Sequence, residues 1–145
     1  MNPLLHSPTH SILVLEPDAV VRSTVASVVR ELDLAQVHQA ASVPLGTQLL
    51  AETAVNALVL SLADNDAALD LLTRLRAGEF PSKADIPVVV LAPACDGPLA
   101  LRLKQLEVLR LLLTPFKIRD VVQTLEALKA EPLPEAASGS SPAQT

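Results

Sequence analysis

Five short runs of apolar residues, each followed by a stretch with helical periodicity, constrain the fold of this chain more than any other feature. The runs are 12–15, 37–40, 57–62, 86–92 and 108–113. Most are unbroken, as in strands that are covered on both faces, and the weaker run at 37–40 is expected at the outside of the sheet. Alternation of such strands with helices predicts a parallel sheet with right-handed crossovers.

Apolar residues recur every three to four positions between these runs, which predicts helices that pack against the sheet. Asp18 is expected to cap the first helix and Asp66 the third, and Gly78 is expected to end the third. The second helix, around 45–52, is expected to be short because Gly46 lies near its start. Five such units are too few for an eight-unit barrel, so we predict an open, doubly wound α/β fold with five strands and five helices.

Composition marks the ends of the folded part. The chain has 145 residues, enough for one domain with a sizeable core. Residues 1–10 carry prolines and histidines without periodicity, and 131–145 form a tail rich in Pro, Ser and Ala. Such segments bury little apolar surface. We therefore predict a flexible N-terminus at 1–10, a folded domain at 11–130 and a disordered tail at 131–145.

Charge and cysteine content exclude several classes of function. The net charge is −5 and the eleven Lys and Arg residues are scattered, so we expect no nucleic-acid partner. No apolar stretch approaches the roughly 18 residues that span a bilayer, and we expect no membrane partner and a cytoplasmic location. The single cysteine, Cys95, excludes an internal disulfide.

Four segments at the predicted strand ends carry a family resemblance. They are ILVLEPD, LVLSL followed by LLTRLR, IPVVVLA and LLLTPF, in that order. This order resembles the receiver (CheY-like) domain of bacterial response regulators across nearly the whole folded part. The resemblance implies a flavodoxin-like sheet with strand order 2-1-3-4-5. It also implies a role in two-component signal transduction, where receivers take part in phosphorelays.

The resemblance also implies a reaction centre at the carboxyl ends of the strands. In this family, two acidic residues after the first strand and an aspartate at the end of the third hold a magnesium ion. That aspartate accepts a phosphoryl group. A Ser or Thr at the end of the fourth strand and a Lys after the fifth then contact the phosphate.

This chain departs from the family pattern at most of those positions. The corresponding residues are Glu16, Asp18, Ser61, Ala92 and Thr114. Ser61 replaces the acceptor aspartate, and a hydroxyl group forms no acyl phosphate. Ala92 replaces the Ser or Thr, and Thr114 replaces the lysine. The sequence therefore predicts a degenerate phosphorylation pocket without a magnesium ion or another cofactor, in a pseudo-receiver.

Two alternative functions stay open at this point. In one, Asp64 is a substitute phosphoacceptor in a rearranged acidic pocket. In the other, the space between Ser61, Ala92 and Thr114 binds a small molecule as a sensor. We predict no metal site and interpret Glu16, Asp18 and Asp64 as a solvated acidic rim, although these carboxylates are where a cation would gather weakly.

The remaining asset of such a domain is its surface, and the fourth helix carries the clearest candidate. Leu101 is expected to point away from the apolar stripe of that helix, and Leu69 is a second outlier on the third helix. Leu111 stands where the family often has an aromatic switch residue. The predicted partner surface is Leu101, Arg102, Lys104, Gln105, Arg110, Leu111 and Arg119.

This surface leads to a functional hypothesis. We predict a stand-alone, atypical response regulator that is not an enzyme. It acts by phosphorylation-independent contact with another signalling protein or with a second copy of itself.

Overall fold

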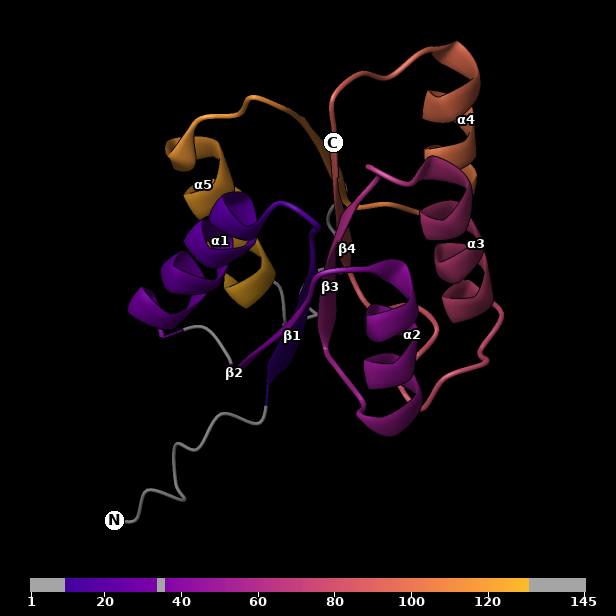
Figure 1. The fold of residues 1–145 in the computed structure, drawn as a ribbon, viewed down its shortest axis with the longest axis horizontal. Helices are drawn as coiled ribbons and strands as arrows, with labels where there is room; N and C mark the ends of the chain where they lie inside the picture. The colour runs from indigo at the N-terminus through magenta and orange to yellow at the C-terminus, as the bar shows by residue number, and fades with distance from the viewer. Residues whose placement is uncertain (1–9, 34–35, 131–145) are drawn as a thin grey trace.

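Five parallel strands form the central sheet in the order β2-β1-β3-β4-β5, with helices on both of its faces (Figure 1). The computed structural model describes residues 10–33 and 36–130. The strands are β1 (Ser11–Leu15), β2 (Gln36–Ala40), β3 (Ala57–Ser61), β4 (Val88–Ala92) and β5 (Arg110–Leu113). The helices are α1 (Ala19–Glu31), α2 (Val43–Glu52), α3 (Asn65–Arg76), α4 (Gly97–Gln105) and α5 (Ile118–Ala130).

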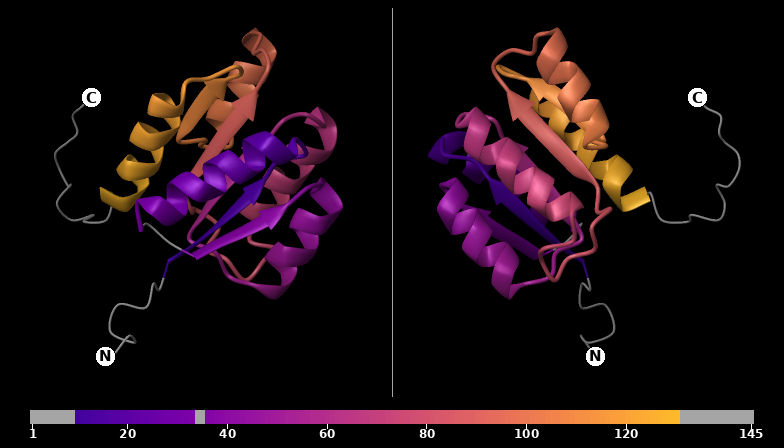
Figure 2. Two further views of the ribbon diagram at one scale, coloured as in Figure 1. Left: turned by 60° about the vertical axis from the view of Figure 1, so that its left-hand side comes forward. Right: turned by 90° about the vertical axis from the view of Figure 1, so that its right-hand side faces the viewer.

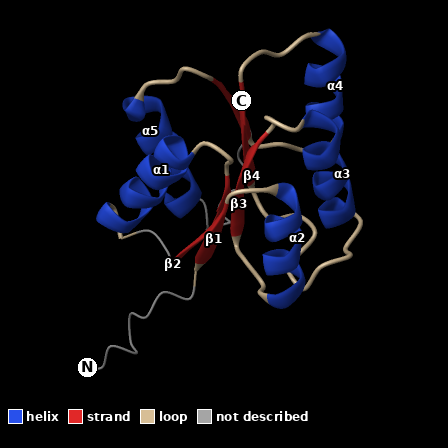
Figure 3. Ribbon diagram, viewed as in Figure 1, coloured by secondary structure: helices blue, strands red, loops and turns tan. Residues whose placement is uncertain are grey.

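This architecture confirms the predicted doubly wound fold and the strand order that the resemblance implied (Figure 3). The N-terminal segment predicted to be flexible, apart from His10, and the predicted tail at 131–145 lie outside the described residues. Within the part of the chain that the structure describes, no helix is long and apolar enough to cross a membrane.

The helices divide into two layers, with α1 and α5 on one face of the sheet and α2, α3 and α4 on the other (Figures 1 and 2). Side chains alternate between the two layers along each strand. Leu13 and Leu15 pack towards the layer of α2 to α4, whereas Ile12 and Val14 pack towards α1 and α5. Every residue of β3 and β4 is buried, because both faces of these central strands are covered.

Helix α2 is longer than the sequence predicted, because it begins at Val43 rather than near residue 45. The Ser42 side chain accepts a hydrogen bond from the Leu45 N–H group at 3.3 Å and caps the helix, while a proline occupies its first turn. Gly46 does not shorten it. A Cβ atom at Gly46 would lie 2.9 Å from the Leu15 Cγ atom, so this glycine allows α2 to approach β1 closely.

The start of α3 corrects a second prediction. The helix begins at Asn65, so Asp66 lies in its first turn and does not cap it. The N-cap position belongs to Asp64, whose side chain makes no capping hydrogen bond. Gly78 ends the helix as predicted, with a φ of 80° that favours glycine.

Arg76 ties the end of α3 to two other segments. Its guanidinium group donates to the carbonyl oxygens of Leu106 at 2.7 Å, Ala84 at 2.7 Å, Ile86 at 2.8 Å and Glu107 at 3.1 Å. Burial lowers the pKa of Arg76, and the carboxylates of Glu107 and Asp85 oppose that shift. Four of the five N–H groups of this side chain are thus committed to backbone acceptors.

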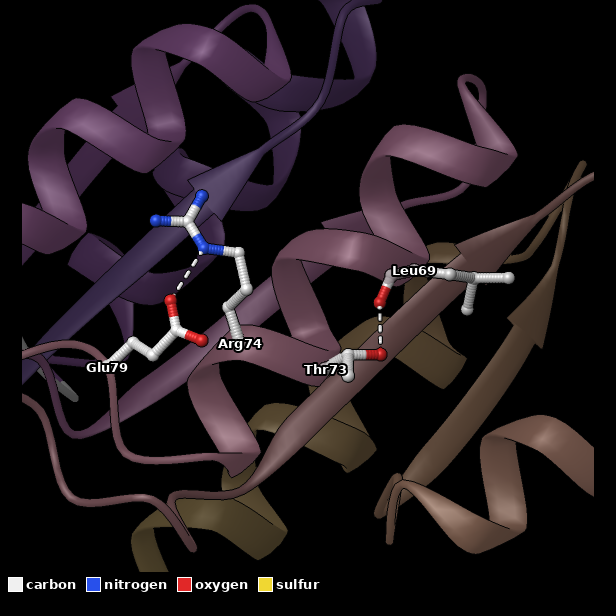
Figure 4. A network of polar contacts seen from close by, with 4 residues as sticks. All are labelled: Leu69, Thr73, Arg74 and Glu79. Carbon is white, nitrogen blue, oxygen red and sulfur yellow. Dashed lines mark hydrogen bonds and ion pairs between the residues drawn. The ribbon is translucent and has the colours of Figure 1, made fainter.

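Side chains of α3 make polar contacts in its second half and with the segment that follows it (Figure 4). The Arg74 Nε atom lies 3.0 Å from the Glu79 Oε1 atom, and the Arg74 guanidinium lies 5.1 Å from the centroid of the Phe80 ring. The Thr73 hydroxyl donates to the Leu69 carbonyl at 2.8 Å. Leu69 itself is half-buried against the core, so the prediction that it points outward is wrong.

Candidate functional site

The predicted pocket residues lie together at the carboxyl ends of the strands. Glu16 directly follows β1, Ser61 and Ala92 end β3 and β4, and Thr114 directly follows β5. These strands are neighbours in the sheet, and the register pairs Ser61 with Leu91. Neighbouring strands lie about 4.8 Å apart, so these four residues form one row across the sheet, which we call the strand-end row.

Both acidic residues after β1 accept hydrogen bonds from backbone N–H groups close to them in the sequence. Glu16 is only 6% exposed, and its Oε2 atom accepts a hydrogen bond from the Asp18 N–H group at 2.9 Å. Arg22 donates to the Glu16 carbonyl oxygen at 2.8 Å. The Asp18 Oδ1 atom accepts from the N–H groups of Val20 at 2.9 Å and Val21 at 3.1 Å, which makes it the N-cap of α1 as predicted.

This arrangement corrects the interpretation of Glu16 as part of a solvated rim. Its carboxylate folds back under the β1–α1 loop and is buried, whereas the carboxylates of Asp18 and Asp64 are exposed. The three acidic residues therefore do not form one solvated group.

The hydroxyl group of Ser61 also makes a hydrogen bond to a backbone group two residues away. Ser61 is 5% exposed, and its Oγ atom accepts a hydrogen bond from the Ala63 N–H group at 3.2 Å. Asp64 lies three residues further along, at the exposed start of α3. The exposed carboxylate and the buried hydroxyl are thus separated by the β3–α3 loop.

Ala92 and Thr114 close the other end of the row. The Thr114 N–H group donates to the Ala92 carbonyl oxygen at 2.8 Å, and the Thr114 hydroxyl donates to the same oxygen at 3.4 Å. Thr114 is half-buried, and its peptide bond to Pro115 is cis. The Thr114 backbone therefore extends the pairing of β4 with β5, and its hydroxyl adds a longer contact to the same oxygen.

These residues do not fit a magnesium site. Mg²⁺ is bound through carboxylates and waters in near-octahedral geometry. At the carboxyl ends of these strands, the buried Glu16 carboxylate accepts a hydrogen bond within its own loop and the Asp18 carboxylate caps a helix. Strand β3 ends on the Ser61 hydroxyl instead of a carboxylate. Among residues 10–33 and 36–130, no three His, Cys, Asp or Glu side chains are grouped so as to hold a metal ion.

The predicted partner surface lies around α4 and the edge strand β5. Leu101 is 58% exposed, while Leu103 of the same helix is buried, so Leu101 points away from the core. Arg102 donates to the Thr73 hydroxyl at 3.0 Å and lies against α3. Leu111 is half-buried against the core. Lys104, Gln105 and Arg110 are exposed on α4 and β5, whereas Arg119 is exposed on α5, in the other helix layer.

Two exposed residues near β5 escaped the sequence analysis. Leu109 is 49% and Leu113 is 50% exposed, and neither belongs to the predicted partner surface. Strand β5 pairs only with β4 and lies at an edge of the sheet. The charged Arg110 within the run was the available signal, because a strand covered on both faces does not carry an arginine there.

The fold is that of response-regulator receiver domains. The chain matches no known family model and no curated protein. It is similar in structure to the non-phosphorylated HemR receiver domain from Leptospira biflexa, with 22% identity over 94% of this chain and 100% of that one, and a TM-score of 0.71.

Two further solved structures share the fold. A response regulator from Thermotoga maritima is 20% identical over 85% of this chain and 99% of that one, with a TM-score of 0.71. The chemotaxis protein CheY4 from Vibrio cholerae is 12% identical over 82% and 98%, also with a TM-score of 0.71. The TM-scores support the shared fold. At identities this low, the similarity does not extend to the chemistry of the strand-end row, which depends on the residues of this chain.

Proposed function

We propose that this chain is a pseudo-receiver in two-component-type signalling, which acts by contact with another protein and without phosphorylation. It is a binding protein rather than an enzyme. The observation that carries the proposal is the bonding state of the strand-end row. The Ser61 and Thr114 hydroxyls and the Glu16 carboxylate are all engaged in hydrogen bonds within the chain.

Phosphoryl transfer to a receiver of the usual kind needs a carboxylate nucleophile and cations that offset the developing charge. Ser61 supplies a buried hydroxyl at the end of β3, and Thr114 supplies a neutral side chain after β5. Both replacements remove a charge that the reaction uses. The burial of Ser61 and Ala92 also disfavours a small-molecule pocket between them, since little of either side chain is accessible.

The surface around α4 supports the contact part of the proposal. Leu101 is an exposed apolar side chain, and Lys104 and Gln105 beside it in the sequence are exposed polar groups. Exposed apolar patches that are rimmed by polar residues mark protein interaction sites, and Leu101 with these neighbours is the candidate centre of such a patch on α4.

Phosphorylation is tested by incubating the protein with acetyl phosphate and Mg²⁺ and measuring its intact mass. We expect no mass gain, whereas a receiver domain that carries the acceptor aspartate and the lysine gains one phosphoryl group under the same conditions. A mass gain in this chain would contradict the proposal. Loss of that gain in Asp64→Asn would assign the phosphate to Asp64, whose exposed carboxylate makes no capping hydrogen bond.

The contact surface is tested by capturing binding proteins from native extract with the wild-type chain and with Leu101→Glu. We expect the variant to lose the specific partner. Leu45→Glu is the matched control, because Leu45 is a similarly exposed leucine on α2. If Leu101→Glu and Leu45→Glu recover the same partners as the wild type, α4 does not form the interface.

A further inference from the structure

A groove with a volume of about 260 Å³ lies between the second half of α4 and the start of β5. Apolar side chains line most of it, and among them Leu103 is buried, Leu111 is half-buried and Leu109 is half exposed. Its charged lining consists of Lys104 and Arg110. We call it the basic groove, because it offers an apolar surface bordered by two positive charges.

Both cations of the basic groove are available to a ligand. The side chains of Lys104 and Arg110 are exposed. The only ion pair in the described part of the chain joins Arg74 to Glu79, so neither cation is paired there. Ammonium and guanidinium groups form their strongest hydrogen bonds with carboxylates, and the groove therefore suits an acidic ligand.

An adjoining groove narrows the choice of ligand further. It has a volume of about 220 Å³, shares Leu109 with the basic groove and carries the exposed carboxylates of Asp85 and Glu107. An acidic segment is attracted by the basic groove and repelled by this neighbour, so it is held on the α4 side of Leu109. The ligand that fits is short, acidic and partly apolar.

Helix α5 leads the chain back towards the start of β5, on the face of the sheet opposite to α4 (Figures 1 and 2). Its residues Val121 and Leu125 share a core cluster with Leu112 of β5. The 13 residues of α5 span about 20 Å, whereas the 4 residues of β5 span about 13 Å. The chain that follows Ala130 therefore starts beside the edge strand that borders the basic groove.

The segment that follows α5 has the composition that the basic groove requires. It begins with Glu131, Leu133 and Glu135, has a proline between each pair of these residues, and carries no Lys or Arg up to residue 145. Proline restricts φ before binding, so a segment with two prolines loses less conformational entropy when it docks. Two carboxylates on either side of a leucine match two cations on an apolar surface.

We propose that the basic groove binds residues 131–135 of the same chain. The first glutamate of the segment pairs with Arg110 on β5, the second pairs with Lys104 on α4, and Leu133 packs on the apolar lining. Lys104 belongs to the predicted partner surface, so the docked segment covers part of that surface. The inference goes beyond the proposed function, because this contact within the chain does not depend on a partner at α4.

Covalent attachment favours this segment over a separate acidic partner. Exposed ion pairs contribute little each, so two of them bind weakly between separate molecules. A segment tethered by a short linker is present at its site at a local concentration of about 1 mM or more. Weak contacts therefore suffice for residues 131–135, which directly follow α5.

Paramagnetic relaxation in the whole chain tests the contact. Cys95 is the only cysteine of the sequence, so Cys95→Ser with Ala137→Cys attaches a single nitroxide label two residues after the proposed contact. We expect the amide signals of Leu109 and Arg110 to lose intensity relative to the same sample with the nitroxide reduced. The amide signals of α2, at the other side of the sheet, are expected to keep their intensity.

Charge reversal in the labelled chain tests the pairing. Lys104→Glu with Arg110→Glu is expected to abolish the intensity loss at Leu109, since like charges then face each other. Adding Glu131→Lys and Glu135→Lys to this variant is expected to restore the loss, because the facing charges are again of opposite sign. Circular dichroism at 222 nm checks that every variant is folded.

Two further measurements separate this pairing from other effects. Arg30→Glu with Lys117→Glu makes the same change of net charge at exposed positions of α1 and of the segment before α5, and we expect it to keep the intensity loss at Leu109. In the labelled chain without charge reversals, salt at about 1 M is expected to reduce the loss, since the screening length falls to about 3 Å. The salt series does not depend on the folding of the charge-reversal variants.

Any of five results would overturn the inference. They are full intensity at Leu109 in the labelled chain, a loss that survives reversal of Lys104 and Arg110, no recovery in the variant with all four charges reversed, a loss that the Arg30 and Lys117 control also abolishes, and an equal loss throughout α2. A sixth is a loss that also appears when the nitroxide is on a second, isotopically unlabelled copy, which would assign the segment to a neighbouring molecule. A chain whose groove stays empty but that still captures a partner through Leu101 would refute the docking and leave the proposed function intact.

Discussion

Truncation of Arg76 is expected to destabilise this fold more than any other change of a surface-reaching side chain. The Arg76 guanidinium is a cationic donor to four carbonyl oxygens, two in the segment before β4 and two at the end of α4. A hydrogen bond to a charged group contributes about 1.5–3 kcal/mol when its partner is left unsatisfied. Because the side chain is only half-buried, water replaces part of this network in the variant.

We therefore expect Arg76→Ala to lower the free energy of unfolding by about 3 kcal/mol, well below the sum of four full bonds. For a domain of this size that corresponds to a fall in Tm of about 12 °C. Arg76→Lys is expected to lose about half as much, because an ammonium group lacks the planar fork that reaches several carbonyls together.

Urea unfolding followed by circular dichroism measures these differences, since the chain has no Trp or Tyr for a fluorescence assay. Arg74→Ala is the control. Its ion pair with Glu79 is between side chains that are 39% and 50% exposed, and such pairs contribute less than about 1 kcal/mol. If Arg76→Ala costs no more than Arg74→Ala, the four hydrogen bonds do not hold α3 to α4 and to the segment before β4.

Three smaller perturbations test other parts of the fold, each by the same unfolding assay. Gly46→Ala is expected to cost about 1–3 kcal/mol because the new methyl group overlaps the Leu15 side chain, and an unchanged stability would mean that α2 shifts freely. Ser82→Ala is expected to cost about 1–3 kcal/mol, since the buried Ser82 Oγ atom accepts the Val55 N–H group at 2.8 Å, and a neutral result would refute that bond. Asp18→Ala is expected to cost about 1 kcal/mol and Asp18→Asn much less, because either Asp or Asn caps a helix; equal losses would show that the charge of Asp18 matters more than its cap.

The arrangement of strands and layers was predictable because a strand that is buried on both faces requires apolar residues at consecutive positions of the sequence. The runs at 57–62 and 86–92 contain β3 and β4 and differ from them only at their ends. The edge strand β5 lies where the strand order implied by the resemblance placed it, but its apolar run does not reveal which of its residues face solvent. The exposure of Leu109 and Leu113 was not predicted for that reason.

The ends of helices were less predictable where several capping residues follow one another. Asp64, Asn65 and Asp66 are all residue types that cap helices, and the spacing of the apolar side chains does not choose between them. The structure places the N-cap at Asp64 without a capping hydrogen bond. The role of Gly46 was hidden for a similar reason, since close approach of a helix to a strand depends on a residue distant in sequence.

The strand-end row was predictable as a set of positions, whereas its bonding was not. The resemblance assigned Glu16, Ser61, Ala92 and Thr114 to the carboxyl ends of the predicted strands, and the structure has these residues at the ends of β1, β3, β4 and β5. Nothing in the sequence indicates that the Glu16 carboxylate turns inward. The network of Arg76 was equally hidden, because its acceptors are backbone carbonyls that every residue possesses.

The most direct test of the central claim is an NMR titration of the isotopically labelled chain with beryllofluoride and Mg²⁺. Beryllofluoride with magnesium mimics a phosphoryl group on an acceptor carboxylate. We expect the amide signals of Ser61, Ala63 and Thr114 to stay in place throughout the titration. Saturable shifts of these signals that require both beryllofluoride and Mg²⁺ would show a working acceptor site and contradict a receiver that signals by contact alone.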